Sequence, residues 1–199
     1  PQFRTSVNEM NKKTLEICNM MISDTLYPRQ EYDGEKLENK IHETFYSQIA
    51  IGTCAMGIYN IFKDAGLKGT FYGGHSLGEL IALSASGEIE ENDFRTLLCN
   101  RAKITNGEGS NFGMYAVIGD VKNINITVPN VEIANYNSNN QIVIVGKQED
   151  VDKESKILSD SGYRVIKLKV SNAFHSSYLE EKGLEFKSHI DKVNLNKIT

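Results

Sequence analysis

The sequence predicts an α/β protein with two parts: a large subdomain built around a parallel sheet, and a small inserted α+β subdomain. Residues 1–106 contain four helical patterns, one of them apolar on nearly every side, as helices buried against a sheet are. Residues 107–175 instead combine short strand patterns with one helical pattern, as ferredoxin-like folds do. We therefore expect residues 1–106 and 176–199 to form the large subdomain, with residues 107–175 inserted as a ferredoxin-like small subdomain.

The length and net charge of the chain exclude some classes of function. The chain has 199 residues, 40% of them hydrophobic, and a net charge of −4. This length buries enough surface for folding without disulfides, and the charge gives no reason to expect nucleic acid or a membrane surface as a partner. No apolar run has the length of a membrane span, and the polar N-terminal residues are unlike a signal peptide. Three widely spaced cysteines favour free thiols, so we expect a cytoplasmic protein without a metal site.

The helices of the first half are separated by recognisable breaks. They are expected at residues 1–25, 38–66, 77–87 and 90–105. A loop with a proline and a glycine follows the first helix at residues 25–36, and Gly66 ends the second. Residues 70–74 form a short strand pattern directly before the third helix. The fourth helix begins with acidic side chains, which the helix macrodipole favours.

The second half of the chain has the pattern of a small sheet. Strands are expected at residues 113–119, 131–137, 141–146 and 163–170. A helix at residues 150–161 separates the last two strands, and a further helix begins near Ser177, before a polar tail. This alternation is the basis of the ferredoxin-like assignment.

The sequence GHSLG, residues 74–78, satisfies the pattern G-x-S-x-G at the junction of a strand and a helix. It predicts the nucleophile turn of an α/β-hydrolase-like subdomain, in which flanking glycines let the chain bend sharply and expose the oxygen of Ser76. The backbone N–H of Leu77 faces the same space, where the start of the helix favours a developing oxyanion. The pattern is short, so Ser76 is either a nucleophile or an ordinary turn serine.

A serine nucleophile needs a base, and the chain has four histidines. His75 adjoins the serine, where neighbouring side chains diverge, which makes it a poor base. His42 and His189 lie among charged residues in helical segments and resemble solvated surface. His175 follows the last strand of the small subdomain, where the chain returns to the large one. It is the best candidate, with a purely structural histidine as the alternative.

Arg101 interrupts the apolar helical segment LLCNRAKI. One interpretation is a side chain whose stem packs while its guanidinium reaches water. The other is a guanidinium that faces a cleft and holds a carboxylate through paired hydrogen bonds.

Five segments match one family in order along the chain. They are GHSLGE (residues 74–79), NRAK (100–103), GMYAVIG (113–119), ANYNSNNQIVIVG (134–146) and AFHS (173–176). Together they resemble the malonyl-CoA:acyl-carrier-protein acyltransferases and the acyltransferase domains of polyketide and fatty-acid synthases. The resemblance covers nearly the whole chain.

The resemblance implies a role for each matching residue. Ser76 attacks a thioester and carries the acyl group, and His175 acts as the base and then as the acid to the leaving thiol. The Leu77 N–H is one oxyanion donor. Arg101 holds the free carboxylate of a malonyl-type group, and Phe174 narrows the pocket against an α-methyl branch.

Three further residues are expected at the substrate site with less defined roles. Asn135 and Asn137 shape the wall near the base, and His75 adjoins the nucleophile. Gln48 stands where the family often has T-Q-P-A, but the sequence here is SQIA, so no role is assigned to it.

The implied reaction is a ping-pong transfer in polyketide or fatty-acid biosynthesis. An acyl-CoA acylates Ser76, CoA leaves, and the phosphopantetheine thiol of an acyl carrier protein takes the acyl group. No cofactor is expected besides these substrates, and flanking synthase domains are further expected partners. Carrier proteins are acidic, so basic side chains are candidates for docking: Lys63, Lys68, Lys103, Lys167 and Lys169.

The chain departs from the family at both ends. The family has an earlier strand with a G-Q-G-S-Q-like turn, and a further strand and helix after the histidine. We therefore expect a chain truncated at both ends, with one oxyanion donor missing and weak or no activity alone. Two other functions stay open: a serine acyl hydrolase, which Arg101 argues against, and a non-catalytic docking module, which intact Ser76, His175 and Arg101 argue against.

Overall fold

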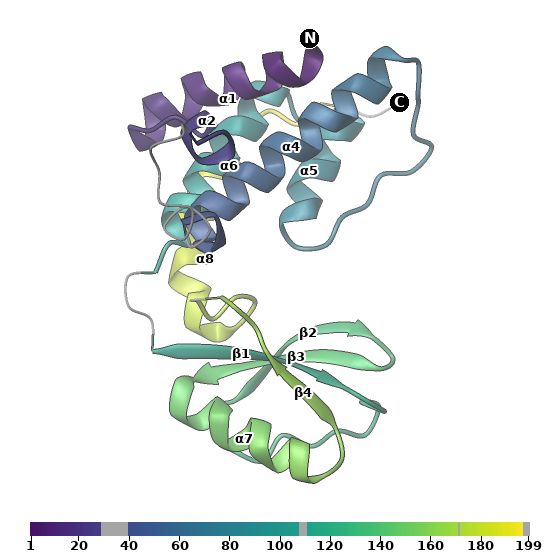
Figure 1. The fold of residues 1–199 in the computed structure, drawn as a ribbon, viewed down its shortest axis with the longest axis vertical. Helices are drawn as coiled ribbons and strands as arrows, with labels where there is room; N and C mark the ends of the chain where they lie inside the picture. Colours follow the sequence, from purple (N-terminus) through teal and green to yellow (C-terminus); the bar gives the residue numbers. More distant parts are fainter. Residues whose placement is uncertain (29–39, 108–110, 171, 197–199) are drawn as a thin grey trace. The chain divides into compact units, whose positions relative to one another are not determined.

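The computed structural model describes residues 1–28, 40–107, 111–170 and 172–196. They form two compact units, Pro1–Thr105 with Glu185–Thr199 and Asn106–Leu184. A mixed α/β architecture is confirmed, with helices in the first unit and a small sheet in the second (Figure 1). Residues 176–184, expected in the large subdomain, belong to the second unit because side chains among them bond to residues at the edge of its sheet.

The regular elements among the described residues of the first unit are helices (Figure 1). Its helices are α1 (Gln2–Cys18), α2 (Ser23–Leu26), α4 (Thr44–Asp64), α5 (Leu77–Ser86) and α6 (Glu91–Ile104). The first expected helix ends early, because Asn19 is left-handed with φ 53° and closes α1. Most of the loop expected at residues 25–36, and the expected start of the second helix, lie outside the described residues.

The core of the first unit lies around α4, which packs against α1, α5 and α6. Phe94 and Leu98 of α6 are almost fully buried in this core. A Cβ atom at Gly52 of α4 would lie 2.5 Å from a methyl carbon of Leu98. The glycine therefore lets α4 and α6 approach more closely than larger residues would allow.

The strand expected at residues 70–74 does not form, and the described part of the first unit contains no parallel sheet. The segment has no hydrogen-bonded strand neighbour there, and Phe71 is 93% exposed. A strand exists only when a second strand pairs with its backbone groups. The α/β-hydrolase-like description is therefore not confirmed, although the turn and the helix after this segment do form.

The second unit contains an antiparallel sheet of order β2-β3-β1-β4. The strands are β1 (Phe112–Ile118), β2 (Glu132–Ser138), β3 (Gln141–Lys147) and β4 (Arg164–Lys167). Helix α7 (Gln148–Asp160) covers one face (Figure 1). The connection from β1 to β2 contains no helix among its residues, where a ferredoxin-like fold has one, so the ferredoxin-like assignment is not confirmed.

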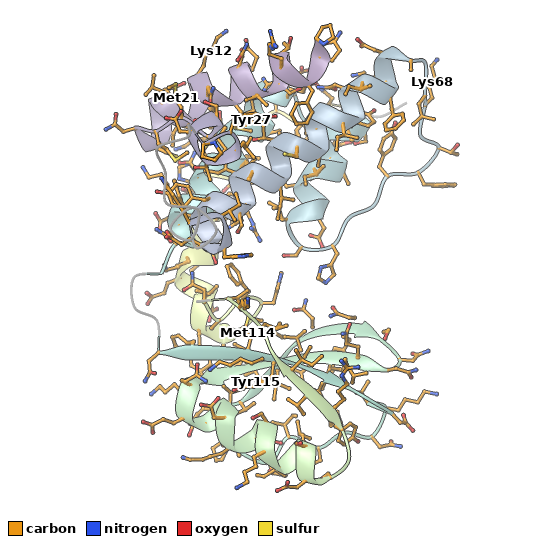
Figure 2. The ribbon with its side chains drawn as sticks, in the orientation of Figure 1. Lys12, Met21, Tyr27, Lys68, Met114 and Tyr115 are labelled. Atoms are coloured by element: carbon orange, nitrogen blue, oxygen red, sulfur yellow. The ribbon has the colours of Figure 1, made fainter. Side chains whose placement is uncertain are left out.

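The two faces of the sheet have separate apolar clusters. Tyr115 of β1 faces α7, where its hydroxyl bonds to Asp152, and Met114 points to the opposite face (Figure 2). This alternation follows from the two-residue period of a strand. On the Met114 face, Val143 and Val145 of β3 pack with Ala173, the residue two positions before His175. Two further helices follow β4: η1 (Ser177–Leu179) and α8 (Glu180–Ile190), whose residues from Glu185 on belong to the first unit.

A buried carboxylate joins α7 to the loop before β2. Glu154 is fully buried, and its oxygens accept hydrogen bonds from the backbone N–H groups of Thr127 and Val128 and from the Thr127 hydroxyl, at 2.8–3.2 Å. Removing the Glu154 side chain takes away three hydrogen-bonded donors' shared acceptor and leaves a gap at a fully buried position, and both effects are costly.

We expect Glu154→Ala to lower the free energy of unfolding by about 2–4 kcal/mol, measured by urea denaturation. The control is Lys156→Ala at an exposed position of the same helix, where a change within about 0.5 kcal/mol is expected. Equal effects of the two substitutions would contradict the structural role given to Glu154.

Candidate active site

Ser76 stands at a strained position at the start of α5. Its backbone has φ 54° and ψ −113°, a conformation that non-glycine residues rarely adopt. The turn is closed by hydrogen bonds from Gly78 N–H to the His75 carbonyl at 2.9 Å and from Glu79 N–H to the Ser76 carbonyl at 3.0 Å. Strained backbone of this kind is typical of functional sites, so the geometry favours a nucleophilic serine over an ordinary turn serine.

The two glycines of G-x-S-x-G differ in what they do. A Cβ atom at Gly74 would lie 2.0 Å from the carbonyl carbon and oxygen of Gly78 and 2.5 Å from the backbone nitrogen of Glu79. Backbone atoms cannot move aside as a flexible side chain can, so the turn requires glycine at position 74. Gly78 has no atom within 4 Å of its ideal Cβ position, and nothing among the described residues requires glycine there.

Leu77 is the first residue of α5, so its N–H is one of the donors that the helix itself leaves unsatisfied. It lies beside Ser76 at the positive end of the helix, which suits the predicted oxyanion donor. His75 is exposed. Its role at the substrate site stays a prediction.

The structure places Arg101 next to the serine. Nη2 of Arg101 lies 3.5 Å from Ser76 Oγ, the long limit of a hydrogen bond. The guanidinium is half-buried, and this burial lowers the pKa of Arg101 from its usual range, while the carboxylate of Glu79 raises it. An arginine stays protonated at neutral pH. The site therefore has a fixed positive charge beside the candidate nucleophile.

Gln48 of α4 holds this guanidinium, a role that the sequence did not reveal. Its Oε1 accepts a hydrogen bond from Nη1 of Arg101, and its Nε2 donates to Thr105 Oγ1 at 2.9 Å. The Thr105 hydroxyl in turn donates to the Arg101 carbonyl at 2.8 Å. Gln48 is only 6% exposed. A buried amide in an otherwise apolar helix was the available signal, because such groups need partners.

Two tyrosines fix the segment that leads into the turn. The Tyr59 hydroxyl of α4 donates to the Ala85 carbonyl at 2.6 Å and lies 3.4 Å from the Tyr72 hydroxyl. Tyr72 also accepts a hydrogen bond from Gly69 N–H at 3.2 Å. The contact with Tyr72, together with burial and the charge of Glu91, raises the pKa of Tyr59 to about 12.

In the second unit, His175 occupies a tight turn between β4 and η1. Its φ is 59°, in the left-handed region, and it is exposed. Ala173 is buried against the sheet and Phe174 packs on the same cluster. The Ser176 hydroxyl donates to the Ala173 carbonyl at 2.6 Å, which closes the turn.

Asn135 and Asn137 both lie on β2. Asn135 pairs with Val143 of β3, directly after a shift of register between Ile133 and Asn135. Its neighbour Ala134 packs in the same apolar cluster as Ala173. Asn137 is exposed and donates to Gln141 at 3.4 Å. Their roles near the base stay predictions.

The candidate residues are divided between the two units. Ser76, Leu77 and Arg101 belong to the first unit, which brings the serine and the arginine together. His175, Phe174, Asn135 and Asn137 belong to the second. Within the described ranges no three His, Cys, Asp or Glu side chains are grouped as metal ligands, and no helix there has the length and apolar character of a membrane span.

Comparison with known proteins identifies the family. The profile of the acyl transferase domain matches residues 1–199. One chain of the polyunsaturated fatty acid synthase of Thraustochytrium is 38% identical over 206 aligned positions, which cover 98% of this chain and 7% of that one. The malonyl CoA-acyl carrier protein transacylase of Bacillus subtilis is 31% identical, over 76% of this chain and 51% of that protein. The chain belongs to the acyl transferase domain family, as its sequence motifs predicted.

Solved structures agree with this assignment. The malonyl CoA-acyl carrier protein transacylase of Clostridium perfringens has a TM-score of 0.78 and 28% identity, and the match covers all of this chain and 64% of that one. The acyl-carrier-protein S-malonyltransferase of Bartonella henselae has a TM-score of 0.80 and 26% identity, over 96% of this chain and 63% of that one. The chain thus spans less than two thirds of the length of these proteins.

The raised pKa of Tyr59 predicts a late tyrosine ionisation, near pH 12 instead of about 10. Because folding favours the neutral phenol, its contribution to stability is complete below pH 10 and is lost as the pH rises toward 12. An ultraviolet absorbance titration should show this late step, and Tyr59→Phe should remove it. If Tyr59→Phe instead removes absorbance change near pH 10 and leaves the change near pH 12, the contact with Tyr72 is contradicted.

Proposed function

We propose that this chain is the catalytic part of an acyltransferase that moves a malonyl-type group from CoA to an acyl carrier protein. The observation that carries the proposal is the guanidinium of Arg101 beside Ser76 Oγ. A serine nucleophile alone does not select among acyl groups. A fixed positive charge next to it favours an acyl group that ends in a carboxylate.

In the proposed reaction, Ser76 Oγ attacks the thioester carbonyl of malonyl-CoA while His175 removes its proton. The N–H of Leu77 donates to the oxyanion, and the thiol of CoA leaves with the proton from His175. The thiol of phosphopantetheine then attacks the seryl ester, and the same steps run in reverse order. The thioester and the seryl ester are close in free energy, so the transfer needs no additional driving force. The enzyme gains more by excluding water, which would hydrolyse the acyl-enzyme.

Selectivity follows from the partners of Arg101. Gln48 holds one side of the guanidinium and occupies Nη1, so the Nη2 side is directed at the serine. An acetyl group would leave this charge without its carboxylate partner, which lowers transition-state binding. We propose that Phe174 limits an α-methyl branch, so that methylmalonyl-CoA reacts more slowly than malonyl-CoA.

The relatives' names support the carrier protein as the acceptor, since both a transacylase relative and a solved neighbour are named for it. We also propose a cytoplasmic location, because free thiols at Cys18, Cys54 and Cys99 fit a reducing compartment. We further propose that synthase domains flank this chain, because the synthase chain that it resembles is far longer.

Acyl loading tests this function directly. Intact-protein mass spectrometry of the full-length protein after incubation with malonyl-, methylmalonyl- or acetyl-CoA should show the largest adduct with malonyl-CoA. Ser76→Ala should abolish the adduct, and Arg101→Ala should reduce malonyl loading by about 10- to 100-fold, the equivalent of one charge-assisted hydrogen bond, with little effect on acetyl loading. Equal malonyl and acetyl loading by the unmodified protein would refute the role of Arg101.

The same loaded protein separates transfer from hydrolysis. If the protein is a transferase, the malonyl adduct should persist in buffer and disappear on addition of holo acyl carrier protein. His175→Ala should slow both loading and discharge, because the base serves both steps. Rapid loss of the adduct without a carrier protein would instead support a serine acyl hydrolase.

A further inference from the structure

Glu132, at the start of β2, holds the segment that directly follows His175. Its Oε2 accepts a hydrogen bond from the backbone N–H of Ser177 at 3.0 Å, and its Oε1 accepts one from the Ser177 hydroxyl. Ser177 is the first residue of η1, so its N–H has no acceptor within that helix. The carboxylate of Glu132 on β2 therefore caps η1 with two charge-assisted hydrogen bonds.

The backbone of Glu132 is held by the sheet. Glu132 pairs with Val145 of β3, and Val145 is fully buried. Tyr178, the residue after Ser177, adds a second connection to the same region: its hydroxyl donates to the Asn130 carbonyl at 2.7 Å, and its ring packs on Phe112 with 4.7 Å between centroids. The start of η1 is thus fixed to the sheet edge at β2.

His175 lies between two fixed points. On its N-terminal side Ala173 is buried and accepts the hydrogen bond from Ser176. On its C-terminal side Ser177 makes its two hydrogen bonds to Glu132. The left-handed backbone of His175 is intrinsically unfavourable, so it persists only where the surrounding structure imposes it.

We propose that Glu132 is a positioning residue for His175, setting the place and direction of the imidazole through its paired hydrogen bonds to Ser177. The inference rests on the proposed function of His175 as the general base. A base must stand within hydrogen-bond reach of the proton that it takes. Displacement of a catalytic group by about 1 Å can cost about 100-fold in rate, so an anchor two residues away affects the chemical step without touching the substrate.

The test compares variants of the full-length protein in two measurements. Rapid-quench mass spectrometry gives the rate constant and the apparent KM for malonyl loading of Ser76, and hydrogen exchange reports protection of the backbone amides at residues 173–179. Glu132→Ala removes both acceptors. Glu132→Gln keeps one acceptor oxygen, and Ser177→Ala removes only the hydroxyl donor. Glu181→Ala, at an exposed position of α8, is the control for loss of one negative charge nearby.

We expect Glu132→Ala to lower the rate constant about 10- to 100-fold, with KM within about twofold, and to speed exchange at residues 173–179. Glu132→Gln and Ser177→Ala should fall between this variant and the unmodified protein. The double variant Glu132→Ala/Ser177→Ala should be no slower than Glu132→Ala, because both changes break the same contact. Glu181→Ala should match the unmodified protein.

A rate constant within twofold of the unmodified protein for folded Glu132→Ala would overturn the proposal, and so would a change in KM alone. Additive losses in the double variant would also overturn it. If the unmodified protein forms no malonyl adduct, the proposed function is wrong. Hydrogen exchange then still tests whether Glu132 holds the turn that contains His175. Faster exchange in Glu132→Ala then upholds the anchor at the turn, and unchanged exchange overturns it.

Discussion

The close approach of two backbone segments at Ser76 is the constraint on which the site depends. Between Gly74 and Gly78 there is no room for a Cβ atom, and the chain passes through a positive φ at the serine to make this contact. Strain of this kind persists only where the surrounding structure imposes it. Here the following helix α5 and the contact between Tyr59 and Tyr72 hold the two ends of the turn. The result is a seryl oxygen at a helix N-terminus.

The charge beside that oxygen is the second determinant. A half-buried guanidinium loses hydration and needs hydrogen-bond partners in the protein. Gln48 supplies one of them, and Gln48 is held in turn because its Nε2 donates to the Thr105 hydroxyl, which donates to the Arg101 backbone carbonyl. Because Gln48 is fixed within the core between α4 and α6, the direction of the arginine depends on packing far from solvent. The specificity proposed for this chain thus depends on a buried amide that binds the arginine.

The sequence predicted the features that local patterns determine. The predictions failed for features that depend on contacts between segments distant in the chain. The turn at Ser76, the helices and the four strands of the second unit follow from glycine spacing and hydrophobic periodicity. The strand at residues 70–74 did not form, because pairing depends on a neighbour that local sequence does not specify. Gln48 and Glu132 were missed for the same reason: each acts through a partner about 45–55 residues away in the chain. The place of residues 176–184 also depended on such side-chain contacts to the sheet.

The central claim is that the turn needs glycine at position 74 because of backbone contact, and that this turn makes Ser76 reactive. The most direct test compares Gly74→Ala with Gly78→Ala for malonyl adduct formation on Ser76 in the full-length protein, with circular dichroism to show that both variants are folded. We predict that Gly74→Ala lowers the loading rate at least about 100-fold, as expected for a misplaced nucleophile, whereas Gly78→Ala, with no atom near its Cβ position, stays within about fivefold. Equal loading by the two folded variants would contradict the account.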